Sequence, residues 1–262
     1  MNAAPTAPPR SRRRPILIVA IVAAVAVAVI GVALYLFFRG DAPAAVDLEA
    51  TRDAVAGSDD AGADTLGSDT SSDAGSAGGI EGTWSIDTSV GEFGVGDATA
   101  TFVGFRVEEE LTSIGSTTAV GRTPVVSGTI DISGETVTAA EITGDLTGIV
   151  SNEARRESAI QRALNTSTNP QATFVLSSPI ELGAGAAAGD LVQTTAAGQL
   201  TVNGITNDVE FEVEAQLIDR MVLVTGTTEV VFADYGVTPP SAPVVVSVED
   251  HGIVEFQLWF SA

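Results

Sequence analysis

Hydrophobic and acidic residues alternate without interruption along the second half of the segment 200–215. The apolar set and the acidic set fall on opposite sides of an extended chain, as Val209, Phe211, Val213 and Ala215 against Glu210, Glu212 and Glu214. A period of two predicts a β-strand with one buried face and one solvated face. Asn203 and Gly204 tolerate positive φ and predict a turn between antiparallel strands. Residues 205–207 lengthen this loop, so its turn type stays open.

The same alternation recurs from about Ile80 to the end of the chain. The segments that predict strands are 83–87, 100–108, 125–132, 135–146, 172–176, 191–202, 209–218, 221–233, 244–249 and 253–260. Ser133 and Gly134, between two of these segments, predict a hairpin. Regular short strands with frequent turn signals are typical of a β-sandwich or a closed barrel, so the fold class is all-β.

One stretch of the β-rich region, residues 152–164, has the composition of a helix instead. Ser151 or Asn152 would cap its start, because a short polar side chain accepts hydrogen bonds from the first free amides. Asn169-Pro170 then forces an extended exit. We expect one short helix that plugs an end of a barrel or crosses a sheet edge.

The N-terminal region contains an apolar run, Ile16–Phe38, that is interrupted by glycine alone. At about 1.5 Å per residue it spans roughly 34 Å, enough to cross a bilayer core. Arginines are concentrated before the run, which predicts that residues 1–15 are a cytoplasmic tail and that the rest of the chain is extracytoplasmic. A cleaved signal peptide is the alternative, with Ala42–Ala44 as the cleavage site. The length of the run favours an uncleaved single-pass anchor in the cell membrane.

Residues 39–79 have a different composition, rich in Asp, Ser, Gly and Ala with few bulky apolar side chains. Such a segment buries too little surface to offset the entropy lost on ordering. We therefore expect an acidic flexible linker between the anchor and a barrel domain at 80–262. A short helix within 44–56 is the exception that the sequence allows.

The charge of the chain limits its partners. It has 12 basic residues, all arginine, against 34 acidic ones, for a formal net charge of −22. This balance argues against nucleic-acid binding, which needs a basic face. With no cysteine, the chain can form neither a disulfide nor a cysteine-bearing metal site.

Few residues have the pattern of a catalytic or metal site. His251 lies between two strands beside Asp250, but no Gly-x-Ser-x-Gly elbow accompanies it, which favours a turn residue over a catalytic triad. The runs 108–110 and 249–251 lack the ligand spacing of a calcium loop. We therefore expect no enzyme, no metal site and no cofactor.

Arg155 and Arg156 are adjacent arginines near the start of the expected helix. In so acidic a chain they are candidates for binding an anionic headgroup. The alternative is salt bridging to neighbours such as Glu153 and Glu157. Arg106 interrupts a strand opposite Phe105, so it faces outward or is buried with a carboxylate.

Bulky apolar residues from separate strands would meet in the interior of the domain. They are Val103, Phe105, Phe174, Phe211, Val213, Phe232, Phe256 and Leu258. Two interpretations stay open at this point: a filled core, or a lumen open at one end to a long lipid. Barrels of about eight strands leave interior space for side chains or for one ligand.

The order of several short motifs resembles the YceI family of polyisoprenoid-binding, lipocalin-like proteins. The motifs are Trp84–Asp87, Gly128–Ile132, Ser151–Glu157, Asn169–Phe174, Gly198–Thr206, Val209–Phe211 and Phe232–Val237. The resemblance covers roughly Gly82 to Phe260. It implies an extended antiparallel eight-stranded barrel that holds an isoprenoid chain, such as a quinone tail or polyprenyl phosphate, and has no catalytic residues. Arg156-Glu157 matches the family's Arg-acid dipeptide, which favours a structural ion pair there.

The sequence thus predicts a membrane-anchored barrel that binds an isoprenoid or similar lipid as carrier, store or sensor. The eight bulky residues above would line the lumen, with Arg155 and Arg156 as headgroup candidates. Pairing of edge strands would give a homodimer. The alternative function is a structural or interaction module with a filled barrel, whose acidic outer face, including Glu210, Glu212 and Glu214, binds a partner.

Overall fold

The structure is a computed structural model that describes residues 42–60, 79–96, 98–112, 115–240 and 245–262. The predicted tail (1–15) and membrane anchor (16–38) lie outside these residues and stay predictions. Among the described residues, no helix combines the length and apolar character needed to cross a bilayer.

Antiparallel strands make up most of the described chain. The strands are β1 (Gly82–Ile86), β2 (Phe102–Leu111), β3 (Gly115–Thr123), β4 (Val126–Ser133), β5 (Thr136–Asp145), β6 (Val150–Ser151), β7 (Gln171–Leu176), β8 (Ile180–Glu181), β9 (Val192–Val202), β10 (Ile205–Ile218), β11 (Met221–Val231), β12 (Val245–Val248) and β13 (His251–Ser261). The helices are α2 (Leu48–Asp60), α3 (Glu157–Ala163) and the 3₁₀ turns η1 (Leu146–Gly148), η2 (Ala154–Arg156), η3 (Ala186–Ala188) and η4 (Phe232–Tyr235).

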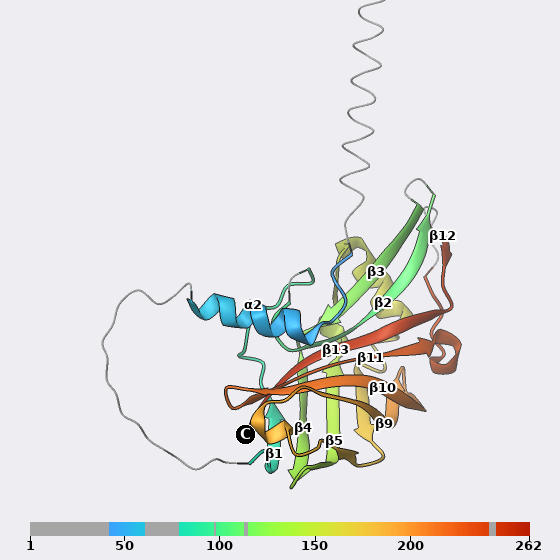
Figure 1. Cartoon of the computed structure of the whole chain (residues 1–262). Helices are drawn as coiled ribbons and strands as arrows, with labels where there is room; N and C mark the ends of the chain where they lie inside the picture. The colour runs from blue at the N-terminus through green and yellow to red at the C-terminus, as the bar shows by residue number, and fades with distance from the viewer. Residues whose placement is uncertain (1–41, 61–78, 97, 113–114, 241–244) are drawn as a thin grey trace, which may run out of the picture. The chain divides into compact units, whose positions relative to one another are not determined.

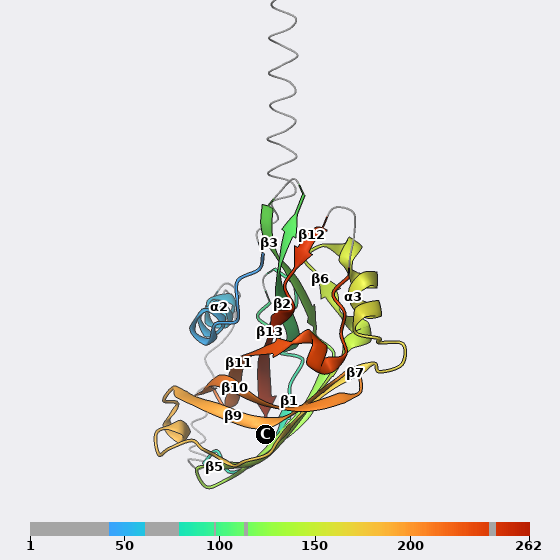
Figure 2. The same cartoon turned by 90° about the vertical axis from the view of Figure 1, so that its right-hand side faces the viewer.

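Several long strands are interrupted, and their pieces stay in line. β1 and β2 pair with successive parts of β13, while β4 pairs with β1 and β3 with β2. Pro124, which has no amide hydrogen for the ladder, separates β3 from β4. Neighbours in the sheet are then neighbours in the chain, and the β1–β13 pairing closes it. The fold is the predicted antiparallel eight-stranded barrel (Figures 1 and 2).

The hairpin of β9 and β10 confirms the alternation that was read from the sequence. Val202 pairs with Ile205, so Asn203 and Gly204 alone form the turn, with φ of 52° and 74°. Two successive positive φ angles are typical of the type I′ turn. The expectation that residues 205–207 lengthen the loop was wrong, because they already belong to β10. The predicted hairpin at Ser133-Gly134 is confirmed, since β4 pairs with β5 across it.

The predicted helix is present but shorter than 152–164. It consists of η2 followed by α3, and in Figure 2 it lies on the side of the barrel away from α2. Asn152 does not cap it. Its side chain instead accepts from the Val120 amide at 3.1 Å and donates to the Thr118 carbonyl at 3.1 Å. This amide therefore satisfies backbone groups of β3 rather than those of the helix.

The first described segment, residues 42–60, is here called the strap, and it is ordered against the outside of the barrel (Figure 1). It contains α2, whose start is capped by Asp47, with Oδ1 accepting from the Ala50 amide at 2.8 Å. Residues 42–60 of the expected linker thus contain a helix, which is the exception that the sequence allowed within 44–56. Residues 61–78 of that linker lie outside the described chain, and the domain boundary at 80 stays a prediction.

Apolar burial holds the strap on the barrel. Leu48, Leu223 of β11 and Trp259 of β13 form a cluster in which they are 2%, 0% and 1% exposed, with Val55 packed beside them. Thr51 adds a hydrogen bond from its hydroxyl to Gln257 Oε1 at 2.6 Å. A lone leucine in a polar segment thus finds its partners on strands near the other end of the chain.

A buried charge cluster lies on the same outer face. Glu255 is fully buried, and its Oε1 accepts from Arg122 Nε at 2.8 Å and lies 2.7 Å from Arg122 Nη2. Its Oε2 makes no hydrogen bond but lies 3.5 Å from Arg106 Nη1. Two guanidinium groups therefore share one carboxylate. The strap supplies two further acceptors, the carbonyls of Pro43, 2.5 Å from Arg106, and Ala44, 2.9 Å from Arg122, and the Val95 carbonyl accepts from Arg122 at 3.0 Å.

Replacing Leu48 by alanine is expected to loosen the strap and expose Trp259. Large-to-small changes at buried leucines cost about 2–5 kcal/mol, and here the loss falls on the docked segment. Acrylamide quenching of tryptophan fluorescence would rise in Leu48→Ala. The exposed neighbour Glu49 provides the control, since Glu49→Ala should leave quenching unchanged. Equal quenching in both variants would contradict the docking described here.

Candidate functional site

The interior of the barrel collects most of the predicted lumen residues. Inward-facing side chains form two adjoining apolar clusters that share Leu176, Ile180, Val224 and Phe256. The predicted lumen residues in these clusters are Val103, Phe174, Phe211, Val213, Phe256 and Leu258. The period-two pattern thus assigned these side chains to the correct face.

Three aromatic rings form a row across this interior. The rings of Phe174 and Phe211 meet edge to face with centroids 5.4 Å apart, and those of Phe211 and Phe256 lie 5.2 Å apart. Glycines on neighbouring strands make room for them. A Cβ on Gly198 would clash with the Phe174 ring, and one on Gly226 would clash with Phe256. The absence of a side chain at these glycines therefore lets the two rings pack directly against the neighbouring strands.

Phe105 and Phe232 lie outside the two clusters. Phe105 pairs with Val254 and Gly121, which places it on the inward side, near Ile149. The prediction that Phe232 lies on a strand face was wrong. The strand β11 ends at Val231, and Phe232 opens η4, where it packs near Gly252. The alternation in 221–233 continued into the turn and gave no sign of this change.

Some side chains inside the barrel are more exposed than those beneath the strap. Phe174, Phe256 and Val103 face inward, yet each stays partly exposed. Leu223 and Trp259 face outward but are at most 1% exposed. Other inward side chains, such as Phe211 and Leu258, are 2% and 3% exposed, so burial differs from place to place within the interior. The interior is therefore an apolar surface on which a ligand can pack.

Asparagine side chains link three of the sequence motifs at one end of the barrel. Asn169 donates to Asn203 Oδ1 at 3.2 Å, Asn203 donates to the Tyr235 carbonyl at 3.1 Å, and Asn207 donates to the Asp234 carbonyl at 2.9 Å. These bonds hold η4 against the β9–β10 turn. The motifs 169–174, 198–206 and 232–237 thus meet in space.

Tyr235 is a polar residue of this end that sequence reasoning did not single out. It is 4% exposed within an apolar cluster, and its hydroxyl has no hydrogen-bond partner among the described residues. Burial raises the pKa of Tyr235, and the nearby Asn207 side chain only partly opposes this. The hydroxyl is therefore neutral at physiological pH and can donate a hydrogen bond. The only signal in the sequence was its position in the motif 232–237.

The two headgroup candidates occupy different environments. Arg156 forms an ion pair with Glu109 and donates to Asn152 Oδ1 at 3.3 Å. Its partial burial lowers the pKa of Arg156. Arg155 is exposed. The partner of Arg156 is Glu109 of β2, not one of the sequence neighbours Glu153 and Glu157. The role of Arg155 and Arg156 in headgroup binding stays a prediction.

His251 opens β13 at an exposed turn. Its Nδ1 lies 2.9 Å from Asp250 Oδ1, and the ligand atoms of Glu249, Asp250 and His251 lie within 4.8 Å of one another. Exposed acidic groups of this kind are common on protein surfaces. The expectation that they bind no metal stays a prediction.

The hydrogen bond to Asp250 raises the pKa of His251 above 6.5, its ordinary value. A raised pKa stabilises the folded protein below the unfolded pKa, and this contribution is lost as pH rises through the folded one. Following the single histidine by NMR, we expect Asp250→Asn to lower the pKa. Glu229→Gln should lower it less, because its effect is Coulombic. An unchanged pKa in Asp250→Asn would contradict the role of this hydrogen bond.

Comparisons with known proteins agree with the topology. The family model of the YceI-like domain matches residues 95–260, more than half of the chain. The chain belongs to the YceI-like domain family. This match begins after β1, so the strand that closes the barrel lies before the matched residues. A search of curated proteins found no match.

Solved structures similar to this YceI-like chain have low sequence identity to it. A polyisoprenoid binding domain from Saccharophagus degradans, implicated in plant cell wall breakdown, is 19% identical, with a TM-score of 0.51 over 68% of this chain and 98% of that one. BcnA from Burkholderia cenocepacia is 18% identical, with a TM-score of 0.46 over 60% and 95%. A YceI protein of Campylobacter jejuni is 12% identical, with a TM-score of 0.44 over 53% and 82%. The first of these likenesses supports the fold.

Proposed function

We propose that this YceI-like barrel binds an isoprenoid or a similar long-chain lipid in its interior, as carrier, store or sensor. The observation that carries the proposal is the set of inward apolar side chains, including Phe174 and Phe256, that stay partly exposed inside a closed barrel. The name of the Saccharophagus degradans domain as polyisoprenoid binding adds support. The function is binding rather than catalysis.

The driving force for such binding is the hydrophobic effect, at about 25 cal/mol per Å² of apolar surface buried. Several hundred Å² of an isoprenoid tail would give ample affinity without a polar contact. A headgroup would remain at an end of the barrel, and the exposed Arg155 is a candidate to bind it. We further propose that Ile16–Phe38 anchors the chain in the membrane, with the barrel on the extracytoplasmic side.

The test is native mass spectrometry of the full-length chain, produced in a host with its membranes intact, followed by solvent extraction of the released ligand. We expect an additional mass that extracts as an isoprenoid lipid. A ligand-free mass that persists after incubation with quinones and polyprenyl phosphates would overturn the proposal. A filled barrel that acts through its acidic outer face would then be favoured.

A further inference from the structure

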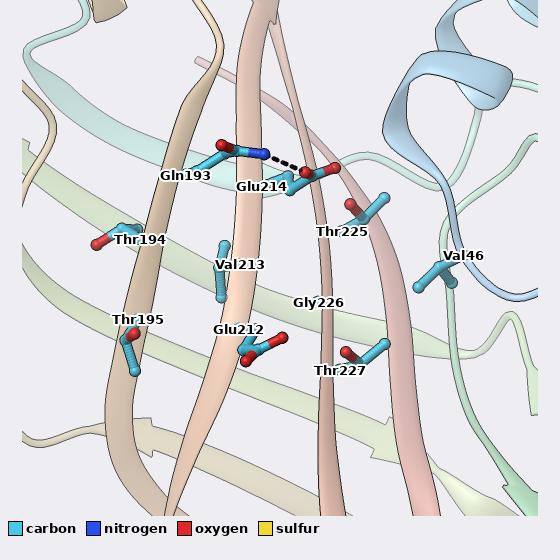
Figure 3. A pocket seen from close by; sticks show the side chains of 10 residues that line it. All are labelled: Val46, Gln193, Thr194, Thr195, Glu212, Val213, Glu214, Thr225, Gly226 and Thr227. Atoms are coloured by element: carbon cyan, nitrogen blue, oxygen red, sulfur yellow. Dashed lines mark hydrogen bonds between the residues drawn. The ribbon is translucent and has the colours of Figure 1, made fainter.

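A half-open groove of about 540 Å³ lies on the outer face of the barrel, over β9, β10 and β11 and beside Val46 of the strap (Figure 3). Its volume is in the range of small-molecule sites. The groove is separate from the interior proposed to hold lipid, because its acidic side chains point to the opposite face of β10.

Two rows of polar side chains run across the strands along this groove. Strand by strand, the rows are Gln193, Glu214, Thr225 and Thr195, Glu212, Thr227. Gln193 Nε2 donates to Glu214 Oε1 at 2.7 Å, which holds that carboxylate in place (Figure 3). The groove is thus a surface of carboxylates and hydroxyls rather than an apolar patch.

Thr225 has the features of an unused ligand contact. It is 3% exposed and lines the groove, and its hydroxyl makes no hydrogen bond within the described residues. Its hydroxyl is on the side of Glu214 in Figure 3. Its oxygen is not among the buried atoms that lack a partner, so solvent reaches it from the groove, and a ligand that supplies a donor would replace a water molecule there.

The charges of the groove define the ligand. Glu212 and Glu214 contribute two carboxylates, and the lining residues include no arginine. Two positions apart on one strand, they are separated by about 7 Å. We propose that the groove binds a ligand with two ammonium groups about 7 Å apart, one at each carboxylate. Val46 would contact the methylene groups between them.

Two sources supply this chemistry. One is a free linear diamine, and the other is a Lys-x-Lys sequence in an extended peptide, because side chains two apart on a strand have the same spacing. Titration calorimetry of the full-length chain at low salt, in an uncharged detergent, separates them. The probes are 1,5-diaminopentane, pentylamine as the single-charge control, and the peptide acetyl-Lys-Thr-Lys-amide.

We expect the diamine and the peptide, which each have two ammonium groups, to bind more tightly than pentylamine. Whichever of these two binds more tightly identifies the ligand as a free diamine or as a Lys-x-Lys peptide. Glu212→Gln and Glu214→Gln should each weaken binding about five-fold. Thr225→Val, which keeps the shape and removes the hydroxyl, should also weaken it. Glu210 is the matched control, since it lies on the same acidic face but outside the groove lining. Glu210→Gln should change affinity less than two-fold.

Three results would overturn the proposal. They are an absence of dication binding at millimolar concentration, equal affinity for pentylamine and the diamine, and an equal loss in Glu210→Gln and Glu212→Gln. The last would show diffuse attraction to an acidic surface instead of a defined site. Lipid content measured by extraction should be the same in all these variants. The proposal for the groove and the proposal for lipid binding can therefore be rejected separately.

Discussion

Replacing Glu255 by leucine is expected to lower the free energy of unfolding by about 3–5 kcal/mol. The substitution removes the carboxylate that two guanidinium groups share and leaves Arg106 and Arg122 with neutral acceptors only. Arg122 is 3% exposed and cannot recover the lost interaction from water. Denaturant unfolding followed by circular dichroism measures the loss.

The size of this effect follows from the imbalance of the cluster. Burying two positive charges against one negative charge leaves an excess that backbone carbonyls of the strap partly offset. Removing the Glu255 carboxylate raises that excess of buried positive charge. When an exposed carboxylate is removed instead, water solvates its former partners and little stability is lost. The ring of Phe102, with its centroid 4.4 Å from Arg122, gives some further compensation.

Glu249 provides the matched control for this experiment. It lies just before β13 and is exposed, so Glu249→Leu should change the free energy of unfolding by about 0.5 kcal/mol or less. A loss below about 1 kcal/mol in Glu255→Leu would mean that the two arginines find other partners. That outcome would contradict the structural role assigned to the cluster.

The face of each strand could be predicted from the sequence where alternation is strict. Phe211 and Val213 are buried inward and Glu212 is exposed outward, as their spacing requires. The pattern failed at Phe232, because a 3₁₀ turn follows the strand and local alternation does not report where pairing ends. The face to which a side chain points is a local property of the strand, but the length of the strand depends on where its partner strand stops pairing with it.

The docking of the strap on the outer face could not be predicted, because it depends on contacts between residues that are distant in the sequence. Thr51 and Gln257 are separated by 206 residues. Composition alone indicates a linker around Leu48, and nothing in the local sequence singles out Glu255 as a buried carboxylate. Once the strap lies over β13, that carboxylate is fully buried. Tertiary packing therefore decides the environment of both segments, and local sequence does not report it.

The interior side chains should control lipid content if the barrel binds a lipid. Phe174→Glu is expected to reduce the amount of co-purifying lipid at least about ten-fold, since a loss of 1.4 kcal/mol already suffices. The carboxylate would lie in the aromatic row beside Phe211, where an apolar chain offers it no hydrogen bond. Solvent extraction and mass spectrometry of the purified full-length protein measure the change.

Val175 separates an effect on the interior from an effect on the strand. It follows Phe174 on β7, faces outward and is 43% exposed. Val175→Glu introduces the same charge one residue away and should leave the lipid content unchanged. Because Phe174→Glu also reduces packing, circular dichroism must first show that the variant is folded. A folded Phe174→Glu protein with undiminished lipid would place the ligand elsewhere than this interior and contradict the proposed function at its central residue.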